Sequence, residues 1–219
     1  METHDVITSW RGSAFALVVA NGEWPPLDVV RRLLGEASMS VSCDGAAQRL
    51  AAEGLDTPIT VGDGDSLPSD VKDRLGSRFV HIAEQETNDL TKAVLYLHGQ
   101  GHERILVVGA TGLREDHTLG NVSLLIHYFK QGIQVRMLTP YGLFLPCKDR
   151  LCLNVKVGQP VSVFRHDATQ LRATGLRYAL YDFSMLWQGT LNEATASEVE
   201  ITGKGYFLVY LPHHGAISG

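Results

Sequence analysis

The chain has 219 residues, a formal net charge of −5, and a composition of 44% hydrophobic and 20% charged residues. These values are typical of a globular protein with a sizeable core and exclude a disordered or fibrous chain. The net charge is negative and no basic stretch stands out, whereas proteins that bind nucleic acids carry a basic patch, so we expect no nucleic-acid partner. The longest apolar runs have the length of strands, so we expect no membrane partner either.

The sequence also carries no sign of export or of a cysteine framework. The first ten residues, "METHDVITSW", lack the basic and apolar regions of a secretory signal, so we expect a cytoplasmic location. Three cysteines, Cys43, Cys147 and Cys152, are too few and too irregularly spaced for a disulfide framework or a zinc knuckle. We therefore expect them to be buried free thiols.

The first part of the chain alternates apolar runs with segments of helical periodicity. Strands are expected at residues 14–20, 38–43, 57–62, 78–85 and 104–112. Helices are expected at residues 25–37, 44–54, 88–101 and 117–130. This alternation predicts an open, mostly parallel α/β sheet covered on both faces, which we assign to residues 1–138.

From about Gln134 onward the pattern changes to short runs that are rich in β-branched and aromatic residues and are separated by turn residues. These runs occupy residues 134–140, 152–158, 160–166, 177–183, 198–203 and 206–212. They predict a small antiparallel β-sandwich, which we assign to residues 139–219. The predicted fold class is therefore an α/β domain followed by an all-β domain.

Polar motifs follow the predicted strands of the first domain, one after another. Asp44 follows the second strand, Asp63 and Asp65 follow the third, and Asn88 and Asp89 open the helix after the fourth. The Gly-rich stretch "GATGLRED" follows the fifth strand. Because ligands of open parallel sheets bind beyond the carboxyl ends of the strands, we expect these motifs to converge on one crevice.

Each motif also has a purely structural explanation. The stretches "DG" at 44–45 and "DGD" at 63–65 are turn signals, and "GATG" is compatible with a tight strand-to-helix turn. Asn88 is a good helix N-cap and Asp89 a good first-turn residue. Taken singly, these explanations are adequate.

The combination of motifs favours a cation. Two carboxylates about 4 Å apart repel by roughly 4 kcal/mol at an effective dielectric constant near 20, so several at one sheet edge need a counter-charge. Oxygen ligands favour Mg²⁺ or Ca²⁺, and Mg²⁺ completes its shell with waters and substrate phosphates. The Gly-rich loop before a helix, with Lys92 and Arg114 beside these motifs, suits the phosphates. The sequence therefore predicts Mg²⁺ with a polyphosphate.

Four ordered blocks, "DGAAQRL", "VGDGDSL", "TNDLTKAV" and "GATGLREDHTLGN", resemble the thiamine pyrophosphokinase family. The second domain resembles it less strongly, at "TGLRYAL" and "QGTLNEA". The resemblance implies an enzyme that transfers the diphosphate of ATP to the hydroxyl of thiamine, giving thiamine diphosphate and AMP. It also implies Mg²⁺ as cofactor, thiamine and ATP as partners, and a homodimer whose active site lies at the subunit interface.

The resemblance also implies roles for individual residues. The expected metal ligands are Asp63, Asp65 and Asp89. The expected catalytic residues are Asp65, Asp89, Arg114 and Asp116. The expected ATP- and phosphate-binding residues are Asp44, Gly45, Asn88, Lys92, Gly109, Thr111, Gly112 and Arg114. The expected thiamine-binding residues are Thr190 and Asn192.

Three positions depart from the family pattern. Gly64 stands where a bulky residue is usual, which predicts a more mobile loop. Leu113 replaces a frequent glycine, which affects the approach to phosphate, and Leu191 stands where a serine is common beside the asparagine.

The thiamine-stacking aromatic of the family has three candidates here, Tyr206, Phe207 and Trp187, and we expect core packing for all of them. For Asp116 the alternatives are to orient or deprotonate the acceptor hydroxyl, or to cap the following helix. Two other functions stay open: a pyrophosphokinase acting on a pterin alcohol, and a non-catalytic thiamine or nucleotide sensor. Retention of Asp63, Asp65 and Asp89 argues against a sensor.

Overall fold

A computed structural model describes residue 10 and residues 14–65 and 67–213. The strands of the first part are β1 (Ala16–Val19), β2 (Met39–Cys43), β3 (Ile59–Gly62), β4 (Phe79–His81), β5 (Arg104–Val108) and β6 (Gln134–Leu138). The helices between them are α2 (Leu27–Glu36), α3 (Asp44–Ala52), α4 (Ser69–Leu75), η1 (Gly76–Arg78), α5 (Asp89–Gly99) and α6 (Glu115–Lys130). Strands and helices therefore alternate as expected, with α4 and η1 as additions.

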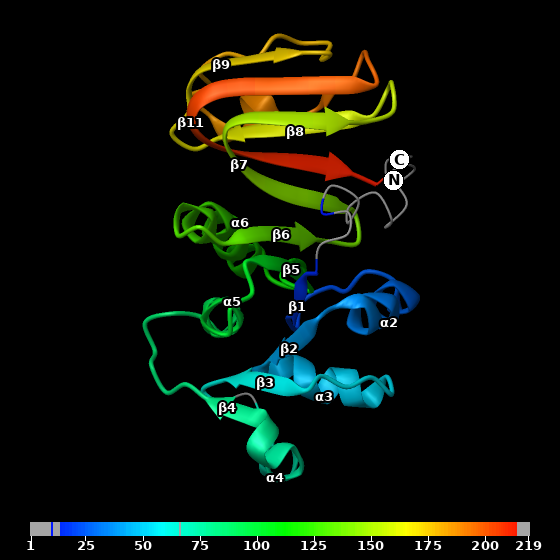
Figure 1. Cartoon of the computed structure of the whole chain (residues 1–219), viewed down its shortest axis with the longest axis vertical. Coiled ribbons are helices and arrows are strands. Elements are labelled where there is room, and N and C mark those ends of the chain that lie inside the picture. The colour runs from blue at the N-terminus through cyan, green and yellow to red at the C-terminus, as the bar shows by residue number, and fades with distance from the viewer. Residues whose placement is uncertain (1–9, 11–13, 66, 214–219) are drawn as a thin grey trace.

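The strands of the first part form one parallel sheet in the order β6-β5-β1-β2-β3-β4. Alternate side chains of β1 enter two separate cores because successive residues of a strand point to opposite faces. Leu17 packs with α2 and α3, whereas Val18 packs with α5 and α6. Figure 1 shows these two helix pairs on opposite sides of the sheet. Covering both faces explains why the strands read as continuous apolar runs.

The second part of the chain is antiparallel. Its elements are β7 (Gly142–Asn154), β8 (Pro160–Arg165), β9 (Thr169–Thr174), η2 (Leu186–Gly189), β10 (Asn192–Glu193) and β11 (Glu198–Pro212). The long strand β11 is central, since it pairs with β7 on one side and with both β8 and β9 on the other. Apolar side chains of these strands pack on one another, and Phe207 of β11 is fully buried among them.

The two parts share one sheet. Strand β7 pairs antiparallel with β6 through Met137↔Phe144 and Leu138↔Leu143, so the parallel strands continue into the antiparallel ones. One apolar core also runs from the α2 and α3 side of the sheet into the interior of the second part. The predicted fold class is confirmed, and the division between residues 138 and 139 stays a prediction.

Several expected details are wrong. Residues 177–183 form no strand, because the polar groups of Asn192 rather than a strand ladder hold the backbone of Tyr178. The two strands expected at 198–203 and 206–212 are the single strand β11, whose register shifts between Thr202 and Tyr206. Cys43 and Cys147 are buried as expected, whereas Cys152 is exposed. None of the described helices combines the length and apolar character that a membrane span requires.

Candidate active site

A pocket of about 330 Å³ lies at the carboxyl edge of the parallel sheet. It sits where strand order reverses, because β1 pairs with β2 on one side and with β5 on the other. Such a switch point is the usual ligand position of open α/β sheets. The pocket is lined by the segments after β1, β2 and β5 and by the first turns of α5 and α6. The lining residues are Ala20, Asn21, Gly22, Cys43, Gly45, Asn88, Asp89, Leu90, Gly109, Ala110, Gly112, Leu113, Arg114, His117 and Asn121.

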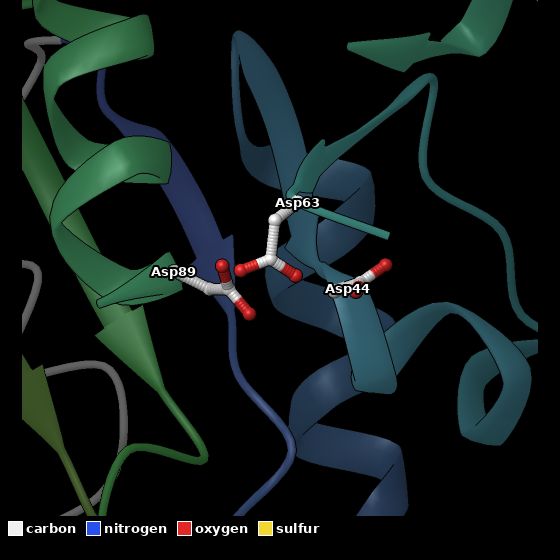
Figure 2. A group of neighbouring side chains, drawn as sticks. All are labelled: Asp44, Asp63 and Asp89. Carbon is white, nitrogen blue, oxygen red and sulfur yellow. The ribbon is translucent and has the colours of Figure 1, made fainter. Parts of the chain in front are cut away.

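Three carboxylates from separate elements meet beside this pocket (Figure 2). Asp44 is the first residue of α3, Asp63 follows β3, and Asp89 is the first residue of α5. One oxygen of each lies within 4.8 Å of the others. The approach depends on Gly62, where a Cβ atom would lie 2.6 Å from the Cβ of Asp44. Three oxygen donors at this separation fit Mg²⁺ and do not fit a soft transition metal.

Lys92, near the start of α5, is paired with two of these carboxylates, those of Asp63 and Asp89. Its Nζ lies 3.2 Å from Asp63 Oδ2 and 3.2 Å from Asp89 Oδ1, and its side chain is only 2% exposed. Burial alone would lower the pKa of Lys92, but the hydrogen bonds to Asp63 and Asp89 outweigh it and raise this pKa. The site is therefore an ion-paired cluster in which Lys92 is positively charged at neutral pH.

The stretch around Asp63 is both a turn and part of the acidic cluster. The backbone N–H of Asp65 donates to Asp63 Oδ1 at 3.0 Å, and Gly64 between them has a φ of 83°. This hydrogen bond, followed by the one from Lys92, lowers the pKa of Asp63. Gln85 also donates to Asp63 Oδ2, at 3.4 Å. The side chain of Asp65 is exposed and lies outside the group of three, so its role as a metal ligand stays a prediction.

The departure at Gly64 has a local explanation. A Cβ atom at Gly64 would lie 2.9 Å from the Cε and Nζ atoms of Lys72 and 3.2 Å from the ring of Phe79. The positive φ also disfavours any other residue. A bulky side chain therefore fits this position only if Lys72 moves.

A hydrogen-bonded network fixes the start of α5. Asn88 is the N-cap, as expected, and its Oδ1 accepts from the backbone N–H of Thr91 at 3.0 Å. The hydroxyl of Thr91 is bonded to that of the fully buried Tyr128 at 2.8 Å. Asn88 Nδ2 donates to Asn121 Oδ1 at 2.9 Å, and Asn121 Nδ2 donates to the carbonyl oxygen of Ala110 at 2.8 Å. These bonds tie α5, α6 and the loop after β5 into one frame.

The loop after β5 takes the left-handed conformations that glycine favours. Gly109 and Gly112 have φ values of 71° and 77°. Leu113, where the family often has glycine, also has a positive φ of 66°, and its side chain is 79% exposed. The backbone therefore keeps the glycine-type turn despite the leucine. The N–H of Gly112 donates to the hydroxyl of Thr118 at 3.0 Å, which closes the loop onto α6.

Arg114 and Asp116 form a forked ion pair at the start of α6. Arg114 Nη2 lies 2.6 Å from Asp116 Oδ2, and Arg114 Nε donates to Asp116 Oδ1 at 3.1 Å. This pairing, followed by the hydrogen bond from the N–H of His117, lowers the pKa of Asp116. The N-cap of α6 is Arg114, so the capping alternative for Asp116 is wrong. Asp116 instead accepts from an N–H of the first turn.

The structure brings most of the predicted phosphate-binding residues together. The pocket is lined by Gly45, Asn88, Gly109, Gly112 and Arg114 from this set, and by the predicted metal ligand Asp89. Asp44 and Lys92 are buried in the adjoining cluster, and the buried Thr111 offers its carbonyl oxygen to Glu23.

Among the lining residues absent from the predicted set, Asn21 and Gly22 come from a segment that carried no predicted site residue. The signal was an Asn-Gly pair directly after the first strand, at the edge where the other motifs lie.

The predicted thiamine-binding residues lie in the second part of the chain and do not line this pocket. Asn192 is 5% exposed, and its side-chain amide is occupied by Tyr178. Its Nδ2 donates to the carbonyl oxygen of Tyr178 at 2.7 Å, and its Oδ1 accepts from the N–H of Tyr178 at 3.0 Å. The hydroxyl of Thr190 donates to the carbonyl oxygen of Trp187 at 2.7 Å. Leu191, between them, has a φ of 59° and a side chain that is 76% exposed.

The three candidate aromatics have different surroundings. Phe207 packs in the core, as expected. Tyr206 is half-buried, with Lys130 4.7 Å and Lys148 5.6 Å from the centre of its ring. The prediction of core packing is wrong for Trp187, which lies on the short helix η2 and is 69% exposed.

The fold and the site together define a class of protein. A parallel sheet with a pocket at its switch point, three clustered carboxylates and a glycine-rich loop before a helix is typical of proteins that handle a metal-bound phosphorylated ligand.

Comparisons with known proteins identify the family within this class. Residues 30–137 match the family model "Thiamin pyrophosphokinase, catalytic domain", and residues 142–210 match "Thiamin pyrophosphokinase, substrate-binding domain". Thiamine pyrophosphokinase 3 of Oryza sativa subsp. japonica is 30% identical over 229 residues, covering 87% of this chain and 82% of that protein. Thiamine pyrophosphokinase of Bacillus subtilis is 28% identical over 189 residues, covering 80% of this chain and 85% of that protein. The chain belongs to the thiamin pyrophosphokinase family.

Solved structures agree on the fold. A Bacillus subtilis thiamine pyrophosphokinase superimposes with a TM-score of 0.73 at 20% identity, covering 90% of this chain and 98% of that one. The yeast thiamin pyrophosphokinase superimposes with a TM-score of 0.75 at 14% identity, covering 97% of this chain and 90% of that one. The comparisons give no support to a pterin enzyme or a sensor.

Proposed function

We propose that this chain transfers the diphosphate of ATP to the primary hydroxyl of thiamine, giving thiamine diphosphate and AMP. Family membership supports the reaction, and one observation in the structure carries it. Three carboxylates and the buried Lys92 adjoin a pocket at the switch point of the sheet. We also keep the prediction that the enzyme is cytoplasmic.

Asp44, Asp63 and Asp89 would hold Mg²⁺, since their oxygen atoms fit the ion in type and separation. When bound, the ion offsets the negative charge of the polyphosphate during transfer. Asp65 stays a proposed ligand and catalytic residue, and the bond from its backbone N–H already holds Asp63 in place.

The loop after β5 and the start of α6 are assigned to phosphate binding and transfer. Residues of the loop after β5 and of the start of α6 line the pocket, where the positive end of the helix dipole favours phosphate. Arg114 lines the pocket and would stabilise charge on the transferred group. Asp116 orients the Arg114 guanidinium through two hydrogen bonds. Because both of its carboxylate oxygens are bonded to Arg114, we assign it the orienting role rather than proton abstraction.

Thiamine binding is proposed for the second part of the chain, around Thr190 and Asn192. Neither residue lines the pocket that adjoins the carboxylates. A second copy of the chain would supply this part of the site, in agreement with the homodimer that the family resemblance implies. The amide of Asn192 is occupied within the chain, so we expect it to shape the thiamine pocket through Tyr178.

The test is release of AMP from ATP and Mg²⁺, with and without thiamine. Wild type should release AMP only when thiamine is present. Asp63→Asn should reduce the rate by about 100-fold or more, because the cluster loses a charge that binds the ion. Asp73→Asn, at an exposed position of α4, is the matched control and should behave as wild type. Absence of thiamine-dependent AMP from folded wild type would overturn the assignment, and a hydroxymethylpterin should be inert as acceptor.

A further inference from the structure

The segment that follows β1, residues 20–24, forms a wall of the pocket. Ala20, Asn21 and Gly22 all line it. The Nδ2 atom of Asn21 lies 2.7 Å from the place a Cβ atom would take on Gly45. The wall therefore touches the start of α3, the helix that carries Asp44.

This wall interlocks with the glycine loop after β5. The N–H of Gly22 donates to the carbonyl oxygen of Gly109 at 2.6 Å, and the N–H of Glu23 donates to that of Thr111 at 2.7 Å. A Cβ atom at Gly22 would lie 2.4 Å from the carbonyl oxygen of Thr111. A Cβ atom at Gly112 would lie 2.6 Å from the Cβ of Glu23. The position of the loop after β5 therefore depends on the position of the wall.

Arg49 holds this wall from α3. Its Nη1 donates to the carbonyl oxygen of Gly22 at 2.6 Å, and its guanidinium carbon lies 3.9 Å from the centre of the Trp24 ring. The Trp24 Nε1 donates to the carbonyl oxygen of Ala20 at 2.7 Å, and the ring presses on Gly109. A planar guanidinium can lie flat on a ring while its N–H groups donate in its own plane, which the ammonium group of lysine cannot do.

The same wall reaches the second part of the chain. The hydroxyl of Tyr141, which lies in the turn between β6 and β7, donates to Glu23 Oε1 at 3.0 Å. Arg49 on one side and Tyr141 on the other therefore hold the segment between the carboxylate-bearing helix and the junction of the two parts.

We propose that Arg49 is a positioning residue for the nucleotide. It fixes the segment after β1, which in turn fixes the glycine loop that faces the phosphates. Arg49 does not line the pocket and has no part in the transfer itself. This inference depends on one part of the proposed function, namely that the pocket binds a nucleotide.

The test is direct binding of AMP, in Mg²⁺-free buffer, by isothermal titration calorimetry. Arg49→Gln should weaken AMP binding by about tenfold, because the segment after β1 loses the charged hydrogen bond that holds it in the binding position. Arg49→Lys should recover part of this loss because it keeps the charge. The control is Arg32→Gln, at an exposed position of α2, which should bind AMP as wild type does.

Steady-state kinetics should show a change in the KM for one substrate only. Arg49→Gln should raise the KM for ATP by about tenfold and leave the KM for thiamine unchanged, which a general loss of stability would not do. If Arg49→Gln does not fold, Arg49→Lys carries the test, with AMP binding at least about threefold weaker than wild type. Wild-type affinity in the folded Arg49 variants would overturn this inference alone. Absence of AMP binding in wild type would overturn the nucleotide pocket itself and this inference with it.

Discussion

The carboxyl edge of the parallel sheet and the segment 177–192 of the second part are both expected to bind substrate, and they are built differently. At the sheet edge, Asp44 and Asp63 come directly after β2 and β3, and Asp89 is the first residue of the packed helix α5. In the segment 177–192, regular structure is limited to η2 and to the first residue of β10. There the backbone is held by side chains, such as Asn192 bonded to Tyr178 and Asp182 bonded to the N–H of Leu171.

The difference shows where a site receives its rigidity. Asp44, Asp63 and Asp89 cannot separate without moving β2, β3 or α5, which are packed in the core. The residues around Thr190 depend on a few polar contacts near the surface. Substitutions at the sheet edge should therefore alter the balance of charges, and substitutions in the segment 177–192 should alter the local backbone structure.

The largest effect is expected for Lys92→Met. The substitution leaves the carboxylates of Asp63 and Asp89 without their buried cation, and breaking such a pair costs about 3 kcal/mol. Urea unfolding in Mg²⁺-free buffer measures this loss, and added Mg²⁺ should restore part of it. Arg74→Gln breaks an exposed ion pair with Asp70 and serves as the control, with a loss of about 0.5 kcal/mol. Equal losses for both variants would contradict a buried cluster.

The ion pair between Lys92 and Asp63 should also make stability depend on pH. The pKa of Asp63 is lowered from 3.8, so its contribution to stability is present above that value and disappears as pH falls through the lower folded pKa. The pKa of Lys92 is raised from 10.5, so its contribution is present below that value and disappears at higher pH. The difference in unfolding free energy between wild type and Lys92→Met should therefore be constant from about pH 5 to 9 and shrink below about pH 4. A difference that grows below about pH 4 would refute the pairing.

An intermediate effect is expected for Asn192→Ala. The variant leaves the backbone N–H and carbonyl oxygen of Tyr178 without their partner, at a cost of about 1–3 kcal/mol. Chemical denaturation measures the loss, and Thr190→Ala, which removes one bond to Trp187, should lose less. An unchanged stability with a raised KM for thiamine would instead show that Asn192 contacts the substrate directly.

The smallest effect is expected for Trp187→Ala. The ring is 69% exposed, so its removal should change the unfolding free energy by no more than about 0.5 kcal/mol. Thermal unfolding of the variant beside wild type measures this change. A loss above about 2 kcal/mol would show that another surface covers the ring in solution.

The same contrast explains what could be predicted from the sequence. Alternating buried strands and helices determine where a parallel sheet ends, so the strand pattern alone is enough to place Asp63 and Asp89 together. The exposed position of Asp65 could not be predicted, because it depends on the turn at Gly64, in which Asp65 contacts Asp63 through its backbone N–H. Asn21 was missed because it lines the pocket without a charge, and Arg49 because it contacts the carbonyl oxygen of Gly22 and not the pocket itself. Residues 177–183 have the composition of a strand, but the amide of Asn192 takes the place of a strand partner.

The central place of β11 also has a consequence for biosynthesis. Its partners β7, β8 and β9 all precede it, and it pairs with all three. The antiparallel sheet therefore cannot close until residues 198–212 have left the ribosome, whereas the parallel strands β1 to β6 are complete at residue 138. Until then β7 lacks its strand partner on the β11 side, and the shared core remains open on that side. A nascent chain paused between residues 154 and 198 would therefore expose this apolar surface to aggregation until β11 is made.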